Sequence, residues 1–256
     1  MKTFILCGGF GTRLDYEGTL IAKPMVRIGM NPILMHIITN YCDQGFNDFV
    51  FCLGHKSNTI IDYFLKENKN KIKILIKEKK FIKFKFKNKK LEFIGNLIFT
   101  GLNSGTGGRI KIAYNKLKLH EDIMMTYGDG LSNIPIKKLI NFHYKNKSKV
   151  TMTAVRPKQR YGVLKLFKNK VKYFDNSNKS SDVLINGGFF VIDKDTIKKI
   201  NDIKTYWEKE PLSYYLSKKK LCAFKHNGFW KSLDTLKDKN DFNILLKTKK
   251  KIPWKV

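Results

Sequence analysis

The clearest chemical signal in this chain is a glycine-rich turn that directly follows a short apolar run. Residues 4–7 are apolar and typical of a buried strand, and the turn that follows consists of Gly8, Gly9, Phe10, Gly11, Thr12 and Arg13. Glycine has no Cβ, so this backbone can bend sharply and approach a bulky ligand. Exposed N–H groups of such a turn form an anion site, and the Arg13 guanidinium offers a fork of donors to phosphate oxygens. The spacing matches neither a P-loop nor a dinucleotide-binding fingerprint, and a turn of this kind also occurs with no ligand.

Lys23 and Asp129 are suited to complete a phosphate site. Pro24 biases the backbone of Lys23 toward an extended conformation, which could aim its ammonium back at the glycine turn. Asp129 stands between Gly128 and Gly130, directly after an apolar run. A polyphosphate needs a hard cation such as Mg²⁺, which uses one or two carboxylates and takes phosphate oxygens and water at its other positions. Asp129 suits this role, although an aspartate between glycines can also simply support its own turn.

A second carboxylate and a second glycine-rich turn give weaker signals. Asp234 directly precedes Thr235, where a helix is expected to begin, and from these residues alone we favour an N-cap role for Asp234. Residues 106–109 read Thr-Gly-Gly-Arg, which is either a further part of the pocket or an ordinary loop.

Alternating strand and helix signals would place these residues at one edge of a sheet. Strands are expected at residues 4–7, 48–53, 123–127, 150–155 and 189–192, and helices at 32–44, around Ile60 and Phe64, at 135–145 and within 193–219. This order implies a parallel sheet wrapped by helices, with right-handed crossovers. The loops at the carboxyl ends of the strands then share one edge, where α/β folds bind ligands.

Residues 66–95 have a different pattern. Lysines alternate with apolar residues at 71–74 and again at 83–87. An alternation of period two predicts strands with one wet face, and therefore a hairpin. We interpret the lysines as a solvated edge that discourages strand-to-strand aggregation rather than as a functional patch.

The formal net charge of +30 suggests nucleic acid as a partner, but its composition argues against a specific nucleic-acid site. The excess is almost all lysine, with few arginines to make bidentate contacts with bases or phosphates. The lysines also occur on every kind of predicted element rather than in one stripe. We therefore expect a compositional bias with non-specific polyanion binding at low salt.

Cysteine usage and apolar runs indicate a cytoplasmic protein. The four cysteines are scattered and form no Cys-x-x-Cys pair, so we expect reduced thiols and no metal site built on them. No apolar run is long enough for a secretory segment or a membrane span.

Taken together, the motifs resemble the sugar-1-phosphate nucleotidylyltransferases, and within them the glucose-1-phosphate cytidylyltransferase branch. The matching segments lie at residues 8–14, 23–26, 106–109, 126–130, 186–190, 207–212, 234–235 and 253–255. The resemblance implies an α/β fold with a Rossmann-like mixed, mostly parallel sheet flanked by helices, and we expect a small accessory β-hairpin region beside it. We expect one domain over residues 1–256, with a nucleotide-binding half to about residue 130 and a sugar-phosphate-binding half beyond it.

The same resemblance implies an activity and a set of site residues. CTP and α-D-glucose 1-phosphate would give CDP-glucose and pyrophosphate in a reaction that depends on Mg²⁺, for the synthesis of deoxysugars of surface polysaccharide. Asp129 and Asp234 match the metal ligands of the family, which overrides the N-cap preference, and Arg13 and Lys23 match its catalytic cations. The nucleotide-binding positions implied are Leu6, Cys7, Gly8, Gly9, Phe10, Gly11, Thr12, Arg13, Lys23, Ser104, Arg109 and Gly128. The sugar-binding positions implied are Gly162, Lys179, Asn186 and Gly188.

One segment departs from the family pattern and leaves alternatives open. Many relatives carry Glu-Lys-Pro where Phe174 is here followed by Asp175 and Asn176, so Lys179 would have to replace the missing lysine. Another nucleotidylyltransferase, using UTP, dTTP or a different sugar 1-phosphate, remains an alternative, as does a non-enzymatic basic nucleic-acid binder. A glycosyltransferase is less favoured, because the segment around Asp129 lacks an Asp-x-Asp motif. The resemblance also implies self-association into a homo-oligomer.

Overall fold

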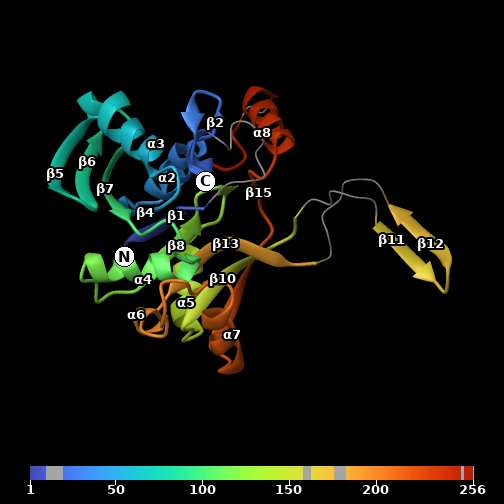
Figure 1. Ribbon diagram of the computed structural model, residues 1–256. Coiled ribbons are helices and arrows are strands. Elements are labelled where there is room, and N and C mark those ends of the chain that lie inside the picture. Colours follow the sequence, from blue (N-terminus) through green and yellow to red (C-terminus); the bar gives the residue numbers. More distant parts are fainter. Residues whose placement is uncertain (10–19, 158–162, 176–182, 249–250, 256) are drawn as a thin grey trace.

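The protein is built on one nine-stranded sheet, whose strands occur in the order β14-β10-β13-β8-β1-β4-β7-β6-β5 (Figure 1). The computed structural model describes residues 1–9, 20–157, 163–175, 183–248 and 251–255. The strands of this sheet are β1 (Thr3–Cys7), β4 (Asp48–Leu53), β5 (Ile72–Glu78), β6 (Phe81–Lys87), β7 (Glu92–Phe99), β8 (Ile123–Tyr127), β10 (Val150–Val155), β13 (Ile185–Ile192) and β14 (Leu221–His226). Three two-stranded sheets accompany it: β2 (Arg27–Ile28) with β3 (Asn31–Pro32), β9 (Gly130–Ser132) with β15 (Trp230–Ser232), and β11 (Val163–Phe167) with β12 (Lys170–Asp175).

The centre of the sheet is parallel and its outer parts are mixed. β8, β1, β4 and β7 are neighbours that all run in the same direction, whereas β13 is antiparallel to β8 and β6 is antiparallel to β7. The carboxyl ends of β1 and β8 therefore meet at one edge, which is where the glycine turn and Asp129 follow their strands. The α/β class and the mixed, largely parallel sheet predicted from the sequence are confirmed.

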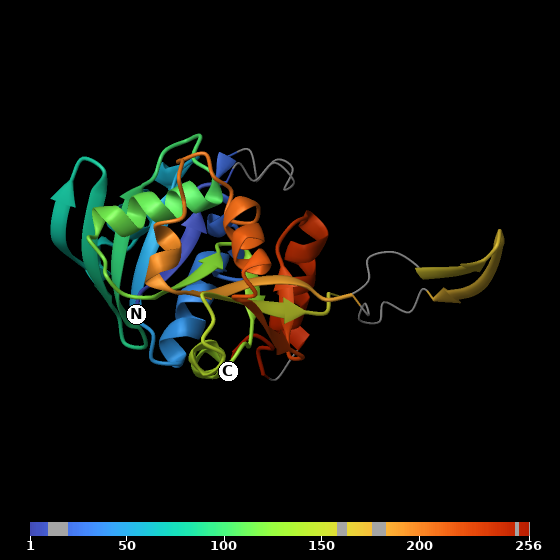
Figure 2. The same ribbon diagram turned by 90° about the horizontal axis from the view of Figure 1, so that it is seen from below.

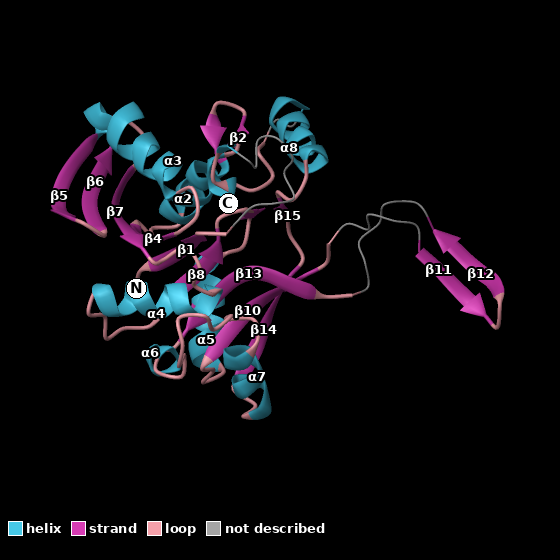
Figure 3. Ribbon diagram, in the orientation of Figure 1, coloured by secondary structure: helices cyan, strands magenta, loops and turns pink. Residues whose placement is uncertain are grey.

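Helices cover both faces of the sheet, as coloured in Figure 3. They are α2 (Ile33–Asp43), α3 (Ser57–Asp62), α4 (Thr106–Lys116), α5 (Ile136–Lys145), α6 (Lys194–Ile197), α7 (Glu210–Ser217) and α8 (Leu236–Thr248), with η1 (Lys23–Met25), η2 (Tyr63–Glu67) and η3 (Lys69–Lys71) as single turns. In Figure 2, α2 in blue and α4 in green lie on opposite sides of the strands. None of the helices in the described ranges is long and apolar enough to traverse a bilayer.

Two hydrophobic cores form because successive strand residues point to opposite faces. Ile5 packs with α2, α3, α5 and α8 in one core, and Phe4 packs with α4, α6 and α7 in the other. Both side chains have no exposed surface. Each such buried side chain contributes about 2 kcal/mol of transfer free energy, so the two faces together hold the central strands in place.

The hairpin predicted in residues 66–95 is present as β5 and β6, and it continues the central sheet, because β6 pairs with β7. In β6, Phe84 and Phe86 face the core while Lys87 is exposed, as the alternation predicts. In β5 the prediction of one wet face is wrong, because this edge strand has no buried residue and even Ile74 is exposed. A second hairpin, formed by β11 and β12, stands away from the body of the protein (Figure 1). Strand β8 of the first predicted half pairs with β13 of the second, so one sheet runs through both halves. The division at about residue 130 remains a prediction.

Candidate active site

Three charged side chains from distant parts of the chain meet at the carboxyl edge of the sheet. The Lys23 ammonium donates to Asp129 Oδ2 at 2.6 Å and to Asp234 Oδ1 at 2.8 Å. The exposed fractions of the three side chains are 16%, 29% and 23%, so the cluster is partly shielded but open to solvent. The two carboxylates that the sequence nominates as metal ligands thus share one cation, next to the glycine turn.

Gly128 explains how Asp129 reaches Lys23. Its N–H donates to the carbonyl of Leu6 at 3.2 Å, which ties the end of β8 to the end of β1. A Cβ on Gly128 would lie 2.6 Å from Pro24 Cγ, so only glycine allows this segment to lie against η1. Lys23 opens η1, and the close contact with Pro24 holds the lysine beside the aspartate.

Asp234 is available for this cluster because another pair of residues starts helix α8. The Asp238 carboxylate accepts from the N–H of Thr235 at 2.9 Å, and the Thr235 hydroxyl accepts from the N–H of Asp238 at 3.2 Å, which is a capping box. The N-cap preference derived for Asp234 from sequence alone is therefore wrong, since Thr235 takes that position. Ser232 donates to Asp234 Oδ2 at 2.7 Å and orients it toward Lys23.

Electrostatics keep this lysine charged. Burial lowers the pKa of Lys23, but the charges and hydrogen bonds of Asp129 and Asp234 outweigh this and raise the pKa above its ordinary value. The ammonium lies between the two carboxylates and bonds to both. Two carboxylates that converge on one cation are a donor set of hard oxygens, which fits Mg²⁺. In the part of the chain that the structure describes, no group of three or more His, Cys, Asp or Glu side chains could hold a metal ion.

The glycine turn is described only at its first two residues, since Phe10, Gly11, Thr12 and Arg13 lie outside the described residues. Gly8 is buried and Gly9 is exposed at the end of β1. The carbonyl of Gly8 accepts from the N–H of His55 at 3.4 Å, so the turn is tied to the segment after β4.

Arg109 lies beneath this turn rather than at its surface. A Cβ on Gly8 or on Gly54 would lie 2.3 Å from Nη1 of Arg109, so both glycines are needed for the guanidinium to fit. The residue is 4% exposed, and its donors reach the carbonyls of Leu53 at 3.2 Å, Gly101 at 2.6 Å and Leu102 at 3.1 Å. Burial lowers the pKa of Arg109. Its contacts join the carboxyl ends of β1, β4 and β7.

Other residues that the resemblance assigns to the nucleotide site lie in the same framework. Leu6 and Cys7 are buried in the last two positions of β1. The Ser104 hydroxyl donates to the carbonyl of Thr100 at 2.5 Å. Cys7 and Cys52 are free, buried thiols, and burial raises the pKa of Cys52 to about 12, which agrees with the expected reduced core cysteines.

The structure describes two of the four residues that the resemblance assigns to the sugar site. Gly162 and Lys179 lie outside the described residues. The side-chain oxygen of Asn186 accepts from the N–H of Gly188 at 2.8 Å, and Gly188 has a φ of +77°, which favours glycine. A Cβ on Gly188 would lie 2.5 Å from Cδ2 of Tyr127, so the Tyr127 ring packs directly against this segment.

A polar cluster that the sequence reasoning did not assign lies on this side of the site. The Tyr127 hydroxyl donates to Glu208 Oε1, and the Thr106 hydroxyl donates to Glu208 Oε2 at 2.6 Å. The only sequence signal was the resemblance of residues 207–212 to the family, which carried no role for Glu208.

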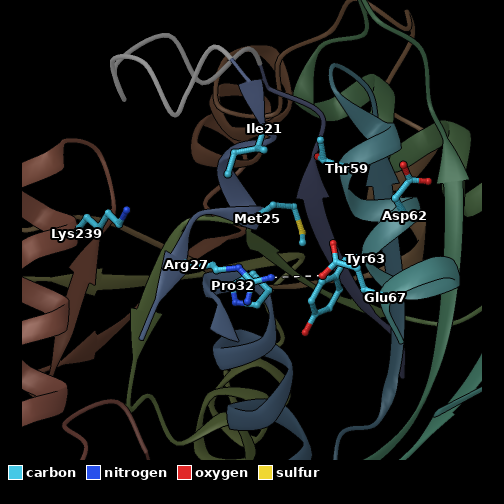
Figure 4. A pocket seen from close by; sticks show the side chains of 9 residues that line it. All are labelled: Ile21, Met25, Arg27, Pro32, Thr59, Asp62, Tyr63, Glu67 and Lys239. Carbon is cyan, nitrogen blue, oxygen red and sulfur yellow. Dashed lines mark hydrogen bonds and ion pairs between the residues drawn. The ribbon is translucent and has the colours of Figure 1, made fainter. Parts of the chain in front are cut away.

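A pocket of about 440 Å³ lies beside η1, whose Met25 forms part of its lining (Figure 4). Met25, Tyr63 and Pro32 form its apolar wall, and Arg27 pairs with Glu67 at 3.4 Å across its mouth. Its lining includes neither Lys23 nor the two carboxylates, so it is separate from the charged cluster.

Known proteins are similar to this chain in sequence and in fold. Residues 2–240 match the family described as Nucleotidyl transferase. Glucose-1-phosphate cytidylyltransferases of Salmonella typhimurium and Salmonella typhi are each 39% identical to the chain over 258 residues, covering 100% of the chain and 99% of the relative. The crystal structure of HddC from Yersinia pseudotuberculosis superposes with a TM-score of 0.67 at 25% identity, covering 94% of this chain and 97% of that one. The match of residues 2–240 to the family and the full-length similarity to these relatives show that the chain belongs to the nucleotidyl transferase family.

Proposed function

We propose that this protein transfers a cytidylyl group from CTP to α-D-glucose 1-phosphate and releases CDP-glucose and pyrophosphate. The observation that carries the proposal is the convergence of Lys23, Asp129 and Asp234 beside the glycine turn, in a chain that matches two cytidylyltransferases from end to end. Glucose 1-phosphate and CTP are the substrates that fit the names of those relatives.

The chemistry is an in-line displacement at phosphorus. A phosphate oxygen of the sugar phosphate attacks the α-phosphorus of CTP, and the bond to the bridging oxygen of pyrophosphate breaks. The attacking phosphate is already ionised near neutral pH, so no general base is required. The protein must hold two anions in line and stabilise the charge that develops, so positioning and electrostatics carry the catalysis.

Asp129 and Asp234 would hold Mg²⁺ in this mechanism, and Lys23 would bind phosphate. When bound, Mg²⁺ neutralises negative charge on the phosphate oxygens and helps to orient them. Lys23 would bind phosphate oxygens in place of its carboxylate partners, as the cation that it already is in this cluster. Arg13 is proposed as a second phosphate ligand from its place in the glycine turn.

Product analysis with a panel of nucleotides tests the proposal directly. Purified protein is incubated with MgCl₂, glucose 1-phosphate and CTP, UTP, dTTP or GTP in turn, and nucleotide sugars are separated by ion-exchange chromatography. We expect CDP-glucose and one equivalent of pyrophosphate with CTP, and no product when EDTA is present. Activity with UTP or dTTP but not CTP would replace the cytidylyl assignment with another nucleotidylyltransferase. The proposal also includes self-association, which sedimentation velocity measures.

A further inference from the structure

We propose that Glu208 determines specificity for the sugar, by accepting hydrogen bonds from hydroxyl groups of the sugar 1-phosphate. This inference rests on the proposed function and adds a named contact to it.

Glu208 is held in a defined position by donors from two separate elements. Tyr127, the last residue of β8, donates to Oε1, and Thr106, the first residue of α4, donates to Oε2. The Thr106 hydroxyl in turn accepts from the N–H of Trp207 at 2.8 Å, which fixes the backbone next to Glu208. Trp207 itself is fully buried and anchors the segment in the core.

The Glu208 carboxylate keeps capacity for further hydrogen bonds. Each carboxylate oxygen has two lone pairs, and one protein hydroxyl is placed on each oxygen. The residue is exposed, so its remaining lone pairs face solvent.

The sheet order places this carboxylate on the acceptor side of the reaction. β8 lies between β1, which leads into the glycine turn, and β13, which carries Asn186 and Gly188. Tyr127 packs against Gly188, so Glu208 is connected to the β13 side of Asp129, whereas Lys23 comes from the segment that follows β1. Tyr127 thus connects Glu208 to the β13 segment, where the resemblance places the sugar 1-phosphate, while Thr106 fixes the same carboxylate to the start of α4.

The charge of Glu208 favours hydroxyl groups over anionic ones. A carboxylate accepts from two neighbouring hydroxyls and repels a second phosphate or a carboxylate on the sugar. In a chain with a net charge of +30, a carboxylate held by two hydroxyls instead of a lysine retains its acceptor capacity for a ligand. The expected acceptor substrates are neutral sugars that carry a 1-phosphate.

The test measures steady-state constants for Glu208→Ala, Glu208→Gln and a matched control, Glu210→Gln. Glu210 is an exposed glutamate two positions along, in the first turn of α7. We expect Glu208→Ala to raise the KM for glucose 1-phosphate about tenfold, with the KM for CTP unchanged, because one charged hydrogen-bond acceptor for the sugar is lost. Glu208→Gln retains one oxygen acceptor and should raise that KM less, and Glu210→Gln should change neither constant.

A series of deoxyglucose 1-phosphates distinguishes direct contact from a structural effect. Removing the contacted hydroxyl from the substrate should raise the KM of the wild type for the sugar 1-phosphate. The same change should leave the KM of Glu208→Ala as it is with glucose 1-phosphate. If Glu208→Ala does not fold, Tyr127→Phe removes one of the hydroxyls that orient the carboxylate, and it should change the same constant in the same direction by a smaller factor.

The possible failures have separate signatures. A wild type that makes no CDP-glucose would refute the proposed function, and the inference with it. An active wild type whose Glu208→Ala variant keeps its KM for the sugar, or raises only the KM for CTP, would overturn the role of Glu208 alone. The same conclusion follows if every deoxy analogue weakens the variant as much as the wild type.

Discussion

Two charged clusters lie at the same edge of the sheet and are built in opposite ways. In the first, Lys23 is paired with two carboxylates that are 29% and 23% exposed. In the second, Arg109 is 4% exposed and donates to backbone carbonyls after β4 and β7. In the first cluster, a ligand could contact the charged groups and replace one of them as a partner. In the second, the charge is surrounded by neutral acceptors in fixed positions.

The contrast shows how a charge with exchangeable partners differs from a charge with fixed ones. A charge whose partners are themselves charged and partly solvated can exchange them for a substrate or a metal ion. A buried guanidinium with its donors directed at backbone carbonyls cannot leave without exposing those carbonyls, which costs the free energy of unmade hydrogen bonds. Arg109 therefore packs against Gly8 and Gly54 and holds the ends of β1 and β4 together.

The largest effect is expected from Asp129→Asn, which removes a negative charge from the Lys23 cluster. We expect turnover to fall about a thousandfold, or ~4 kcal/mol of transition-state stabilisation, while the fold is retained. Pyrophosphate release measures the rate, and circular dichroism monitors the fold.

Asp43→Asn is the matched control, because Asp43 is an exposed aspartate at the end of α2. Near-normal turnover in Asp129→Asn would show that the cluster does not carry the chemistry.

The next largest effect is expected from Arg109→Met, which acts on the second cluster. Loss of the guanidinium leaves three backbone carbonyls without this donor, so the free energy of unfolding should fall by about 3 kcal/mol. Urea denaturation followed by tryptophan fluorescence measures the change.

Arg27→Met provides the comparison for Arg109, since Arg27 is 56% exposed and pairs with Glu67 at the surface. We expect Arg27→Met to lower the free energy of unfolding by less than about 1 kcal/mol. If Arg109→Met and Arg27→Met lowered the free energy of unfolding equally, the distinction between a buried and an exposed arginine would be contradicted.

A smaller effect is expected from Thr235→Ala, which tests what positions Asp234. The substitution removes the N-cap hydroxyl of α8 and should lower stability by about 1 kcal/mol. Turnover should fall only a fewfold, because Ser232 still orients Asp234. A loss of turnover as large as that of Asp129→Asn would mean that the capping box, rather than Ser232, holds the carboxylate in place.

The smallest effect is a pH dependence that belongs to Lys23. Because its pKa is raised in the folded state, the folded protein binds this proton more tightly than the unfolded chain does. The resulting stability is fully present below about pH 10 and is lost as the pH rises through the raised pKa. Unfolding of the wild type and of Lys23→Met, measured in urea from pH 8 to pH 12, should show a difference in stability that narrows only at the alkaline end. A difference that narrows between pH 8 and pH 9 would contradict the raised pKa.

Much of the fold follows from local sequence patterns. The bounds of β4, β8 and β10 were predicted to the residue, because each is an apolar run that ends in a turn or a change of composition. Helix α2 was predicted within one residue at each end, since its apolar spacing and Gly45 indicate where it lies. The place of Asp129 after β8 follows from the same reasoning.

The partners of the charged side chains did not follow from local patterns. Lys23 and Asp234 are separated by 211 positions, and nothing near either residue indicates that they meet. Local sequence favoured a cap for Asp234, and the structure gives the cap to Thr235 because Asp238 completes the box. Arg109 was assigned to the nucleotide pocket on resemblance alone, and its burial beneath Gly8 depends on the packing of three strand ends.

The amino-acid sequence alone determined β4, β8, β10 and α2, because backbone preference and hydrophobic period act over a few neighbouring residues, whereas α4 was not predicted as a helix. The tertiary structure decided which charges lie together and which lie beneath the turn, as well as how the lysine-rich hairpin continues the sheet. Those outcomes depend on contacts between residues far apart in the chain, whose free energies exist only once the sheet and its two cores have formed.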